Sequence, residues 1–265
     1  VISFPVSAMP AISVMEEKSE PDAAPAVSVV TVVRNCAGSI LTTMRSVAAQ
    51  RGVRIEYIVI DGASTDGTAR LIRSFSPAPD IFISEPDGGI YSAMNKAVRL
   101  ASGRYVIFMN AGDSFASDTA VADLLNATCG SDIVYGDILA GRGGEWSDLR
   151  VASEPRNCHR IWFCHQAAMV RRELLLRYGF DERYKLSADF NFFKKCLKAG
   201  CSFRHLHEVV ACFDTAGASA SGRMRGLRED LAIVRENDYG VDRLKFEVKL
   251  RLQIFMQHLR NVVCR

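Results

Sequence analysis

The feature that most constrains the fold is a series of apolar, β-branched runs that alternate with helical segments. Residues 27–33 read Val-Ser-Val-Val-Thr-Val-Val, and the runs at 55–60 and 105–109 have a similar character. Such continuous runs are typical of strands that are buried on both faces of a parallel sheet. Because helical segments separate them, we predict an α/β fold: a mostly parallel central sheet, connected by right-handed crossovers and flanked by helices.

The helices between these strands are predicted from the spacing of apolar residues. Ile90, Met94 and Val98 repeat every four residues, which places them on one face of a helix over 90–101. The other elements expected in the first half are helices at 38–50, 66–75 and 119–127 and strands at 80–84 and 132–135.

The second half has a less regular pattern. Residues 136–165 carry Gly141, Gly143 and Gly144 and are expected to be irregular. The later elements expected are strands at 166–170 and 207–213, helices at 172–177, 187–199 and 227–236, and a tail from 241. Residues 244–252 also alternate as a strand would, but the length and composition of the tail favour a helix.

The balance of charge and the pattern of cysteines exclude several classes of protein. A net charge of +3 is too small to indicate a partner nucleic acid. The sequence contains no run of about 18 apolar residues, so no transmembrane helix is predicted. Residues 1–15 lack the basic start of a signal peptide. Eight cysteines without a Cys-x-x-Cys pair are typical of reduced thiols, which predicts a cytoplasmic protein.

Two small groups combine residue types that bind metals. The pairs Cys158-His159 and Cys164-His165 match no zinc signature. His205 and His207 lie two residues apart, which places both on one face of a strand. We interpret this histidine pair as ordinary surface.

Two predicted strands end in carboxylates. Asp61 follows the run at 55–60, and Asp113 follows the run at 105–109 within the sequence Asn-Ala-Gly-Asp. In an open parallel sheet, ligands bind outside the carboxyl ends of the strands. The sequence therefore predicts a site for a sugar, a phosphate or a metal at that edge.

Five segments, in the same order, resemble motifs of family 2 glycosyltransferases. They are Glu-Tyr-Ile-Val-Ile-Asp-Gly-Ala-Ser-Thr-Asp-Gly-Thr at 56–68, Glu-Pro-Asp-Gly-Gly-Ile-Tyr-Ser-Ala-Met-Asn-Lys at 85–96, Phe-Met-Asn-Ala-Gly-Asp at 108–113, His-Gln at 165–166, and Gly-Phe-Asp-Glu-Arg-Tyr-Lys-Leu-Ser-Ala-Asp-Phe at 179–190. The resemblance is to the enzymes that build bacterial exopolysaccharide, O-antigen or colanic-acid-type repeats. It implies a GT-A fold, a nucleotide-sugar donor such as a UDP-sugar, a glycan or lipid-linked acceptor, and inversion at the anomeric carbon.

The resemblance also implies a division of the chain. Residues 27–220 would form the GT-A domain, with a nucleotide-binding half at 27–113 and an acceptor-side half at 114–220. Residues 1–26 are expected to be a flexible tail, because they are rich in proline and charge. Residues 221–265 would add C-terminal helices.

On the donor side, the resemblance assigns roles to the ends of the first strands. Asp61 would bind the base or ribose, with Thr31 and Arg34 flanking the same nucleotide. Asp87 would shape the nucleotide pocket, and the adjacent glycines would let the backbone approach closely; these are Gly88 and Gly89. Two structural alternatives stay open: Asp61 capping the turn that follows it, and Asp87 capping the next helix.

The resemblance implies a divalent metal, Mg²⁺ or Mn²⁺, on the leaving diphosphate. Asp113 would bind it, beside Asn110 in the nucleotide-sugar site, although Asp113 in a plain turn is an alternative. Many relatives have Asp-x-Asp-Asp where this chain has Asn-Ala-Gly-Asp. Since one carboxylate with phosphates and waters can hold Mg²⁺, we expect metal use with modest affinity.

On the acceptor side, Asp189 would be the general base. It stands where a helix is predicted to begin, so a structural cap is the alternative. His165 would lie near the acceptor or be a buried, hydrogen-bonded histidine. The main competing function is a catalytically silent module that binds a sugar nucleotide or a glycan, and a nucleotidyltransferase is a minor alternative. A dinucleotide-dependent oxidoreductase would require Gly-x-Gly-x-x-Gly after the first strand, and that motif is absent there.

The C-terminal segment 241–265 combines an apolar helical stripe with six basic and two acidic residues. This pattern allows docking on an anionic membrane surface, which would suit a lipid-linked acceptor and a peripheral enzyme at the inner face of the plasma membrane. Packing against the catalytic domain or a partner subunit is the alternative.

Overall fold

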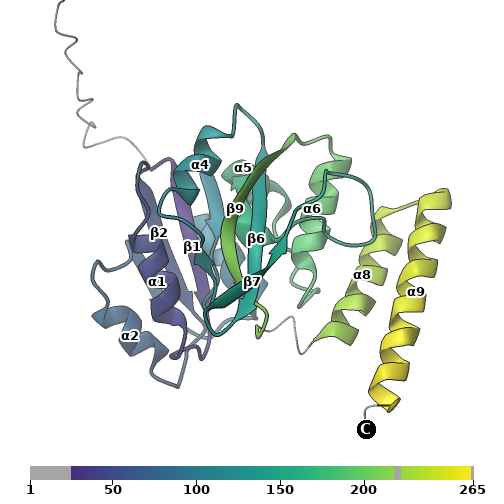
Figure 1. The fold of residues 1–265 in the computed structure, drawn as a ribbon, viewed down its shortest axis with the longest axis horizontal. Coiled ribbons are helices and arrows are strands. Elements are labelled where there is room, and N and C mark those ends of the chain that lie inside the picture. The colour runs from purple at the N-terminus through teal and green to yellow at the C-terminus, as the bar shows by residue number, and fades with distance from the viewer. Residues whose placement is uncertain (1–24, 218–221, 264–265) are drawn as a thin grey trace, which may run out of the picture.

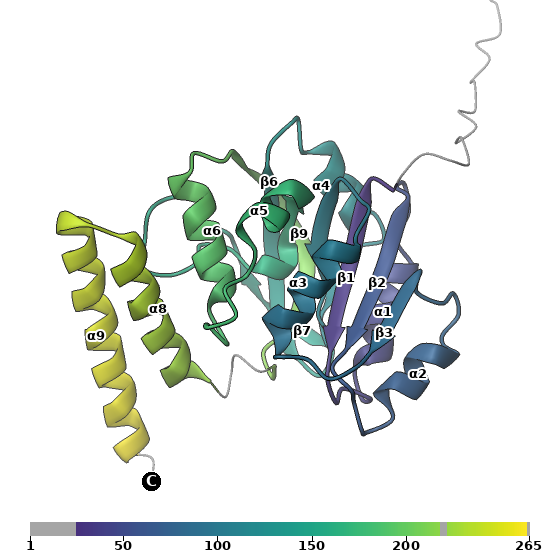
Figure 2. The same cartoon turned by 180° about the vertical axis from the view of Figure 1, so that it is seen from behind.

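The computed structural model describes residues 25–217 and 222–263. The expected flexible tail therefore lies almost wholly outside the described residues. Within them the chain forms a central sheet with helices on both faces and two C-terminal helices at one end (Figures 1 and 2).

The sheet has the order β3-β2-β1-β4-β8-β6-β9-β5, with β7 paired to β6. Its strands are β1 Val27–Val33, β2 Ile55–Asp61, β3 Ile81–Ser84, β4 Tyr105–Phe108, β5 Ser114–Phe115, β6 Ile133–Arg142, β7 Glu145–Arg150, β8 Ala168–Arg171 and β9 Phe203–Asp214. The first four strands are mutually parallel, and β6 and β9 are parallel to each other. β8 runs antiparallel between β4 and β6. The predicted α/β fold with a mostly parallel central sheet is confirmed.

Helices cover the two faces of the sheet. They are α1 Ile40–Ala48, α2 Thr68–Ser74, α3 Ile90–Leu100, α4 Ala120–Asn126, α5 Arg172–Tyr178, α6 Ala188–Lys198, α8 Arg223–Asn237 and α9 Gly240–Val263, with a 3-10 turn, η1, at His165–Ala167. One core lies between the sheet and α3, α5 and α6, and a second core lies between the sheet and α1, α2 and α4. Figure 1 is viewed from the α1 side and Figure 2 from the α3 side.

The first strand shows how the sequence dictates these layers. All seven residues of β1 are buried, and its valines divide between the two cores: Val30 and Val32 face α3, whereas Val27 and Val29 pack with the α1 side. A strand with both faces covered requires a continuous apolar run rather than an alternating one.

The expectation of an irregular segment over 136–165 is wrong for its first part. β6 continues to Arg142 and forms a hairpin with β7. Gly143 and Gly144 have φ values of +63° and +92°, so they form the tight turn of the hairpin instead of marking a loop. A side chain at Gly141 would meet the carbonyl of Glu145, which explains the third glycine. Residues 151–164 are irregular, as expected.

Two other expectations differ in detail. The short strand β5 was not predicted, and β9 begins four residues before the expected 207. Residues 165–167, expected to open a strand at 166, form η1 before β8. Two-residue strands and single 3-10 turns carry no periodic signal, because each is shorter than one repeat of the pattern that would reveal it.

The C-terminal segment forms helices, as predicted, and α8 and α9 pack on each other at the edge of the molecule (Figure 1). A buried ion pair joins them to the domain: Lys194 Nζ on α6 lies 2.7 Å from Asp238 Oδ2, in the link between α8 and α9. Phe246 and Leu250 bury one face of α9. Among the described residues, no helix is long and apolar enough to cross a membrane.

Candidate active site

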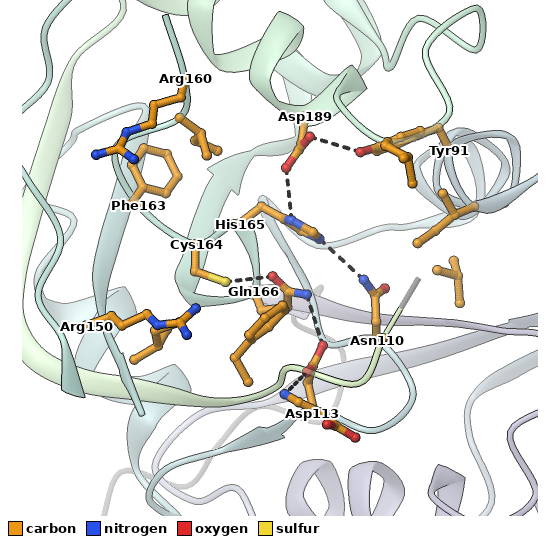
Figure 3. Close-up of a pocket in the computed structure, with 18 of the residues that line it drawn as sticks. Tyr91, Asn110, Asp113, Arg150, Arg160, Phe163, Cys164, His165, Gln166 and Asp189 are labelled. Atoms are coloured by element: carbon orange, nitrogen blue, oxygen red, sulfur yellow. Dashed lines mark hydrogen bonds and ion pairs between the residues drawn. The ribbon is translucent and has the colours of Figure 1, made fainter. Parts of the chain in front are cut away.

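A cavity of about 990 Å³ opens beyond the carboxyl ends of β1 and β4 (Figure 3). Its walls come from the residues after these two strands, from the N-terminal ends of α3 and α6, and from the irregular segment 151–164 together with η1. The charged residues that line it are Arg34, Arg150, Arg156, Arg160, Lys185 and Lys249 and the four carboxylates Asp87, Asp113, Asp189 and Asp214. This excess of cations suits a ligand with a diphosphate.

Asp189 lies in the first turn of α6 and faces the cavity (Figure 3). Tyr91 Oη donates to its Oδ1 at 2.9 Å, and its Oδ2 lies 3.2 Å from His165 Nδ1. Burial would raise the pKa of this carboxyl, but the hydrogen bonds from His165 and Tyr91 outweigh burial and lower the pKa. Asp189 is therefore a desolvated carboxylate that stays ionised.

His165 connects Asp189 to the end of β4. Since its Nδ1 faces the Asp189 carboxylate, we assign the proton to Nδ1 and leave Nε2 as an acceptor. Asn110 Nδ2 lies 3.3 Å from that Nε2. The Oδ1 of Asn110 is then a buried acceptor without a hydrogen-bond partner among the described residues.

Asp113 is linked to Asn110 through the backbone, because its N–H donates to the Asn110 carbonyl at 3.0 Å. The backbone N–H of Asp214 donates to its Oδ1 at 2.8 Å, and Gln166 Nε2 donates to its Oδ2 at 3.0 Å. Burial raises the pKa of Asp113 to about 6, although these two donors oppose the shift. Each carboxylate oxygen has a second lone pair, so Asp113 keeps capacity for a further ligand.

The donor set at the end of β4 fits the divalent ion that the sequence implies. Mg²⁺ and Mn²⁺ take oxygen ligands, and Mg²⁺ commonly combines one or two carboxylates with substrate phosphates. Asp113 provides carboxylate oxygens, and Asn110 Oδ1 is a buried amide oxygen that lacks a donor. A buried acceptor without a partner among the described residues, in the same loop as a buried carboxylate, is what a site for a cation with oxygen ligands would leave.

Asp87, Gly89 and Arg34 also line the cavity. Asp87 Oδ1 accepts the N–H of Gly89 at 2.8 Å, so Asp87 also stabilises the turn before α3. A Cβ atom at Gly62 would lie 2.7 Å from the Asp87 carboxylate, so the absence of a side chain at Gly62 leaves room for this carboxylate. Gly88 does not line the cavity, but its carbonyl accepts from Lys185 Nζ at 3.1 Å and holds that cation at the cavity wall.

Two further expected site residues, Thr31 and Asp61, do not line the cavity either. Thr31 is fully buried, and its hydroxyl donates to the Met109 carbonyl and contacts Tyr57 Oη. Thr31 therefore does not line the cavity, and its expected place beside the nucleotide stays a prediction.

Asp61 is likewise fully buried. Its carboxylate accepts from the hydroxyls of Ser64 and Ser84 and from the Ser64 N–H. These hydrogen bonds hold the turn after β2 and tie it to Ser84 at the end of β3, as the capping alternative implies. The expected contact of Asp61 with a base or ribose stays a prediction.

Several residues in the cavity were given no role from the sequence. Arg156 and Arg160 come from the irregular segment, where no periodic pattern marks which side chains face inward, and Arg150 ends the unpredicted strand β7. Tyr91 and Asp214 reach the site only through the folding of α3 and β9. Gln166 falls within the quoted His-Gln motif, and this motif was the one available signal for it.

The chain matches the family model described as glycosyl transferase family 2 over residues 28–184. It is 33% identical over 207 residues to a PGL/p-HBAD biosynthesis glycosyltransferase of Mycobacterium tuberculosis, which covers 74% of this chain and 79% of that protein. It is also 27% identical over 207 residues to the hyaluronan synthase of Pasteurella multocida, but covers only 21% of that protein.

Solved structures show the same fold. Residues 1–349 of S. aureus TarS in complex with UDP superpose with a TM-score of 0.65 at 18% identity, covering 84% of this chain and 70% of that chain. The mannosyltransferase PcManGT from Pyrobaculum calidifontis, in complex with GDP-Man and Mn²⁺, gives a TM-score of 0.65 at 20% identity, covering 89% of this chain and 71% of that one. The chain therefore belongs to glycosyltransferase family 2, has the GT-A fold, and is a glycosyltransferase that uses a nucleotide-sugar donor.

Proposed function

We propose that this glycosyltransferase inverts the anomeric centre as it moves a sugar to a hydroxyl group of a glycan or lipid-linked acceptor in bacterial surface polysaccharide synthesis. The observation that carries the proposal is the arrangement in Figure 3: the Asp189 carboxylate faces the same cavity as Asp113 and is connected toward it through His165 and Asn110. One end can hold the donor diphosphate, and the other can accept a proton from the acceptor.

The donor side is formed by Arg34, Asp87, Gly89 and Asn110. Arg34 is exposed at the end of β1, where its guanidinium can pair with a phosphate group. We propose a UDP-sugar as donor, supported by the S. aureus TarS complexes with UDP and UDP-GlcNAc on the same fold. PcManGT holds GDP-Man on that fold, so a GDP-sugar is the alternative to test.

Asp113 and Asn110 would hold a divalent cation, Mg²⁺ or Mn²⁺. When bound, such an ion supplies positive charge that stabilises the departing diphosphate. Arg34, at the same edge of the cavity, adds a fixed positive charge from the protein itself. Gln166 and the Asp214 N–H would keep the Asp113 carboxylate oriented while it binds the cation.

The chemistry at Asp189 is a proton transfer coupled to a single displacement. As the acceptor oxygen attacks the anomeric carbon, its proton moves to a free lone pair of the Asp189 carboxylate. The bond between the anomeric carbon and the diphosphate oxygen breaks, and its electron pair leaves with the nucleoside diphosphate. Tyr91 and His165 are positioning residues, since each holds one oxygen of Asp189.

The stereochemistry of the product tests this mechanism. From an α-linked nucleotide sugar, a single displacement is expected to give only the β-glycoside, because the acceptor attacks the face opposite the leaving group. The measurement is the anomeric coupling constant in the NMR spectrum of the first product formed. An α-glycoside as the initial product would contradict a single displacement and would require a covalent intermediate or a front-side mechanism.

The acceptor is proposed to carry negative charge, as a diphosphate-linked lipid does. Arg150, Arg156 and Arg160 line the cavity on the side of the irregular segment, and Lys249 reaches it from α9. No carboxylate of α9 lines the cavity. This wall would attract an anionic headgroup, and α9 connects it to the exposed C-terminal surface.

We propose that α9 rests on an anionic membrane surface at the cytoplasmic face. Its inner face is buried through Phe246 and Leu250, whereas an apolar stripe on the other side is exposed. The stripe is formed by Leu244, Val248, Leu252, Phe255 and Leu259. The exposed cations Lys245, Lys249 and Arg260 lie on the same helix, so apolar contact and charge can act together.

Vesicle binding tests this role of α9. The triple variant Leu244→Ser/Leu252→Ser/Phe255→Ser is expected to reduce co-sedimentation with vesicles containing phosphatidylglycerol by more than about tenfold, since each lost side chain removes roughly 1.5–3 kcal/mol of apolar burial. A matched control, Gln253→Ser/His258→Ser, changes two exposed polar residues of the same helix and is expected to bind as the unmodified protein does. Equal binding by the triple variant would contradict the membrane proposal. If the stripe instead joins two copies of the chain, light scattering would show a dimer for the unmodified protein and a monomer for the triple variant.

A further inference from the structure

We propose that the chain carries a second metal site, for Zn²⁺, formed by Glu154, His205 and His207 on the far side of Tyr135 from the cavity. One potential ligand atom from each of these residues lies within 4.8 Å of the others. None of the three lines the cavity, and none belongs to the donor or acceptor site described above. The proposal stands independently of the proposed function.

The two histidines are placed by strand geometry. They lie two residues apart on β9, where the register with β6 shifts between Leu206 and Val209, so this bulge rather than simple alternation sets how the two rings meet. Their centroids are 4.0 Å apart. His205 pairs across the sheet with Tyr135 of β6, and its ring stacks on the tyrosine ring at a centroid distance of 5.0 Å with planes 5° apart. The orientation of the His205 ring is therefore fixed before any ligand binds.

Asp137 fixes which nitrogen of His205 is free. Its Oδ1 lies 2.8 Å from His205 Nε2 and also accepts the backbone N–H of Ala152 at 2.9 Å. A buried carboxylate requires donors, so the proton of His205 belongs on Nε2. A carboxylate behind a histidine in this way is the usual support for a histidine that binds zinc through its other nitrogen.

The free nitrogen of His205 faces a carboxylate. Nδ1 lies 3.9 Å from Glu154 Oε1, which is too long for a hydrogen bond. Two electron-rich atoms at this separation favour a cation between them. Two ligands on one tetrahedral zinc ion, each about 2.0–2.2 Å from it, lie roughly 3.4 Å apart, so a small movement closes the gap. The Glu154 side chain is 76% exposed and free to make it.

The ligand set selects the metal. Two imidazoles and one carboxylate, with a water in the fourth position, suit Zn²⁺ far better than Mg²⁺, which prefers oxygen ligands alone. The set therefore differs in kind from the oxygen site at Asp113 and can be titrated separately.

The position of the site suggests what bound zinc would do. Glu154 belongs to the irregular segment 151–164, whose neighbours Arg156 and Arg160 line the cavity. The histidines belong to the sheet. A zinc ion would fasten this segment to β9 and thereby steady one wall of the cavity, where the backbone otherwise has few regular hydrogen bonds.

Calorimetric titration with Zn²⁺ tests the site, using the full chain after treatment with EDTA and desalting, in buffer containing Mg²⁺ to occupy oxygen sites. We expect one Zn²⁺ per chain, with affinity falling by at least about tenfold in His207→Ala and in Glu154→Gln. Both residues are exposed, so neither change threatens folding. His258→Ala, which removes an exposed histidine of α9, serves as the matched control and is expected to bind Zn²⁺ as the unmodified chain does.

Two further readouts separate this site from cysteines and from Asp113. Co²⁺ in place of Zn²⁺ is expected to give the visible absorption of a tetrahedral nitrogen and oxygen site, without the intense near-ultraviolet band of thiolate ligands. Zn²⁺ at a hundredfold excess over its Kd is expected to raise the Tm by roughly 5–10 °C in the unmodified chain but not in His207→Ala. Zinc binding that survives both His207→Ala and Glu154→Gln, that disappears in Asp113→Asn, or that is absent in the unmodified chain would overturn the proposal.

Discussion

Replacing Asp189 with asparagine is expected to lower the rate of sugar transfer by about 10²- to 10⁴-fold, the usual contribution of a positioned general base. Asparagine has nearly the same shape and keeps an oxygen for Tyr91 or His165 to contact, but it cannot take the acceptor proton. Binding of the nucleotide sugar should stay within a few fold, since Asp189 is proposed to act on the acceptor. Initial rates at saturating donor, together with donor affinity, measure the two effects separately.

Asp181→Asn is the matched control for this change. Asp181 lies in the same motif, but it pairs with Arg183 and does not line the cavity. Its replacement should leave the transfer rate within about twofold. An Asp189→Asn variant that retains more than a tenth of the rate would show that Asp189 only caps α6.

The pH profile of His165→Ala shows whether His165 supports the base. Burial alone would raise the pKa of Asp189, and His165 is the main group that opposes it. Without His165 the pKa of Asp189 should rise, so that the loss of activity on acidification begins at a higher pH. A purely structural role would lower the rate equally at all pH values and leave the acidic limb in place.

Asp113→Asn is expected to remove the effect of metal on donor binding and to lower the transfer rate by roughly 10²- to 10³-fold, because several kcal/mol of charge stabilisation depend on this carboxylate. In the unmodified chain, Mn²⁺ should tighten the binding of a nucleoside diphosphate measured by calorimetry, and EDTA should abolish that gain. The variant should bind the nucleotide with the same weak affinity in either condition.

Asp118→Asn provides the control for Asp113→Asn. Asp118 is a nearby acid in an exposed ion pair with Arg51 and lies outside the cavity. Its replacement should preserve the full response to Mn²⁺. If Asp113→Asn responded to Mn²⁺ as the unmodified chain does, the metal would have to be held elsewhere.

The alternation of strands and helices could be predicted from the sequence because burial leaves a periodic trace. β1 is a nearly continuous apolar run because both of its faces are covered. α3 repeats its apolar residues about every four positions because only one of its faces is buried. The sequence does not predict the β6–β7 hairpin, because clustered glycines indicate a loop as readily as a tight turn. Their positive φ values show that the same residues form a tight turn between paired strands.

The site was predictable at strand ends only in part. Asp113, after β4, lines the cavity, as does Asp189 at the start of α6. Thr31 and Asp61 do not, because their side chains satisfy buried neighbours. Sequence position places a residue at the end of a strand, while the direction of its side chain depends on partners far along the chain. The same holds for the proposed zinc site: the spacing of His205 and His207 is visible in the sequence, but the approach of Asp137 is a product of folding.

We propose that this chain transfers a sugar from a nucleotide donor, with Asp189 as base and a divalent ion at Asp113. Release of nucleoside diphosphate from UDP-, GDP- and dTDP-sugars, with Mg²⁺, Mn²⁺ or EDTA, tests it most directly when the unmodified chain and Asp189→Asn are compared. We expect metal-dependent release from one donor, preferably a UDP-sugar, that EDTA and Asp189→Asn each suppress. Release that is indifferent to both EDTA and Asp189→Asn, or no binding of any nucleotide, would contradict it.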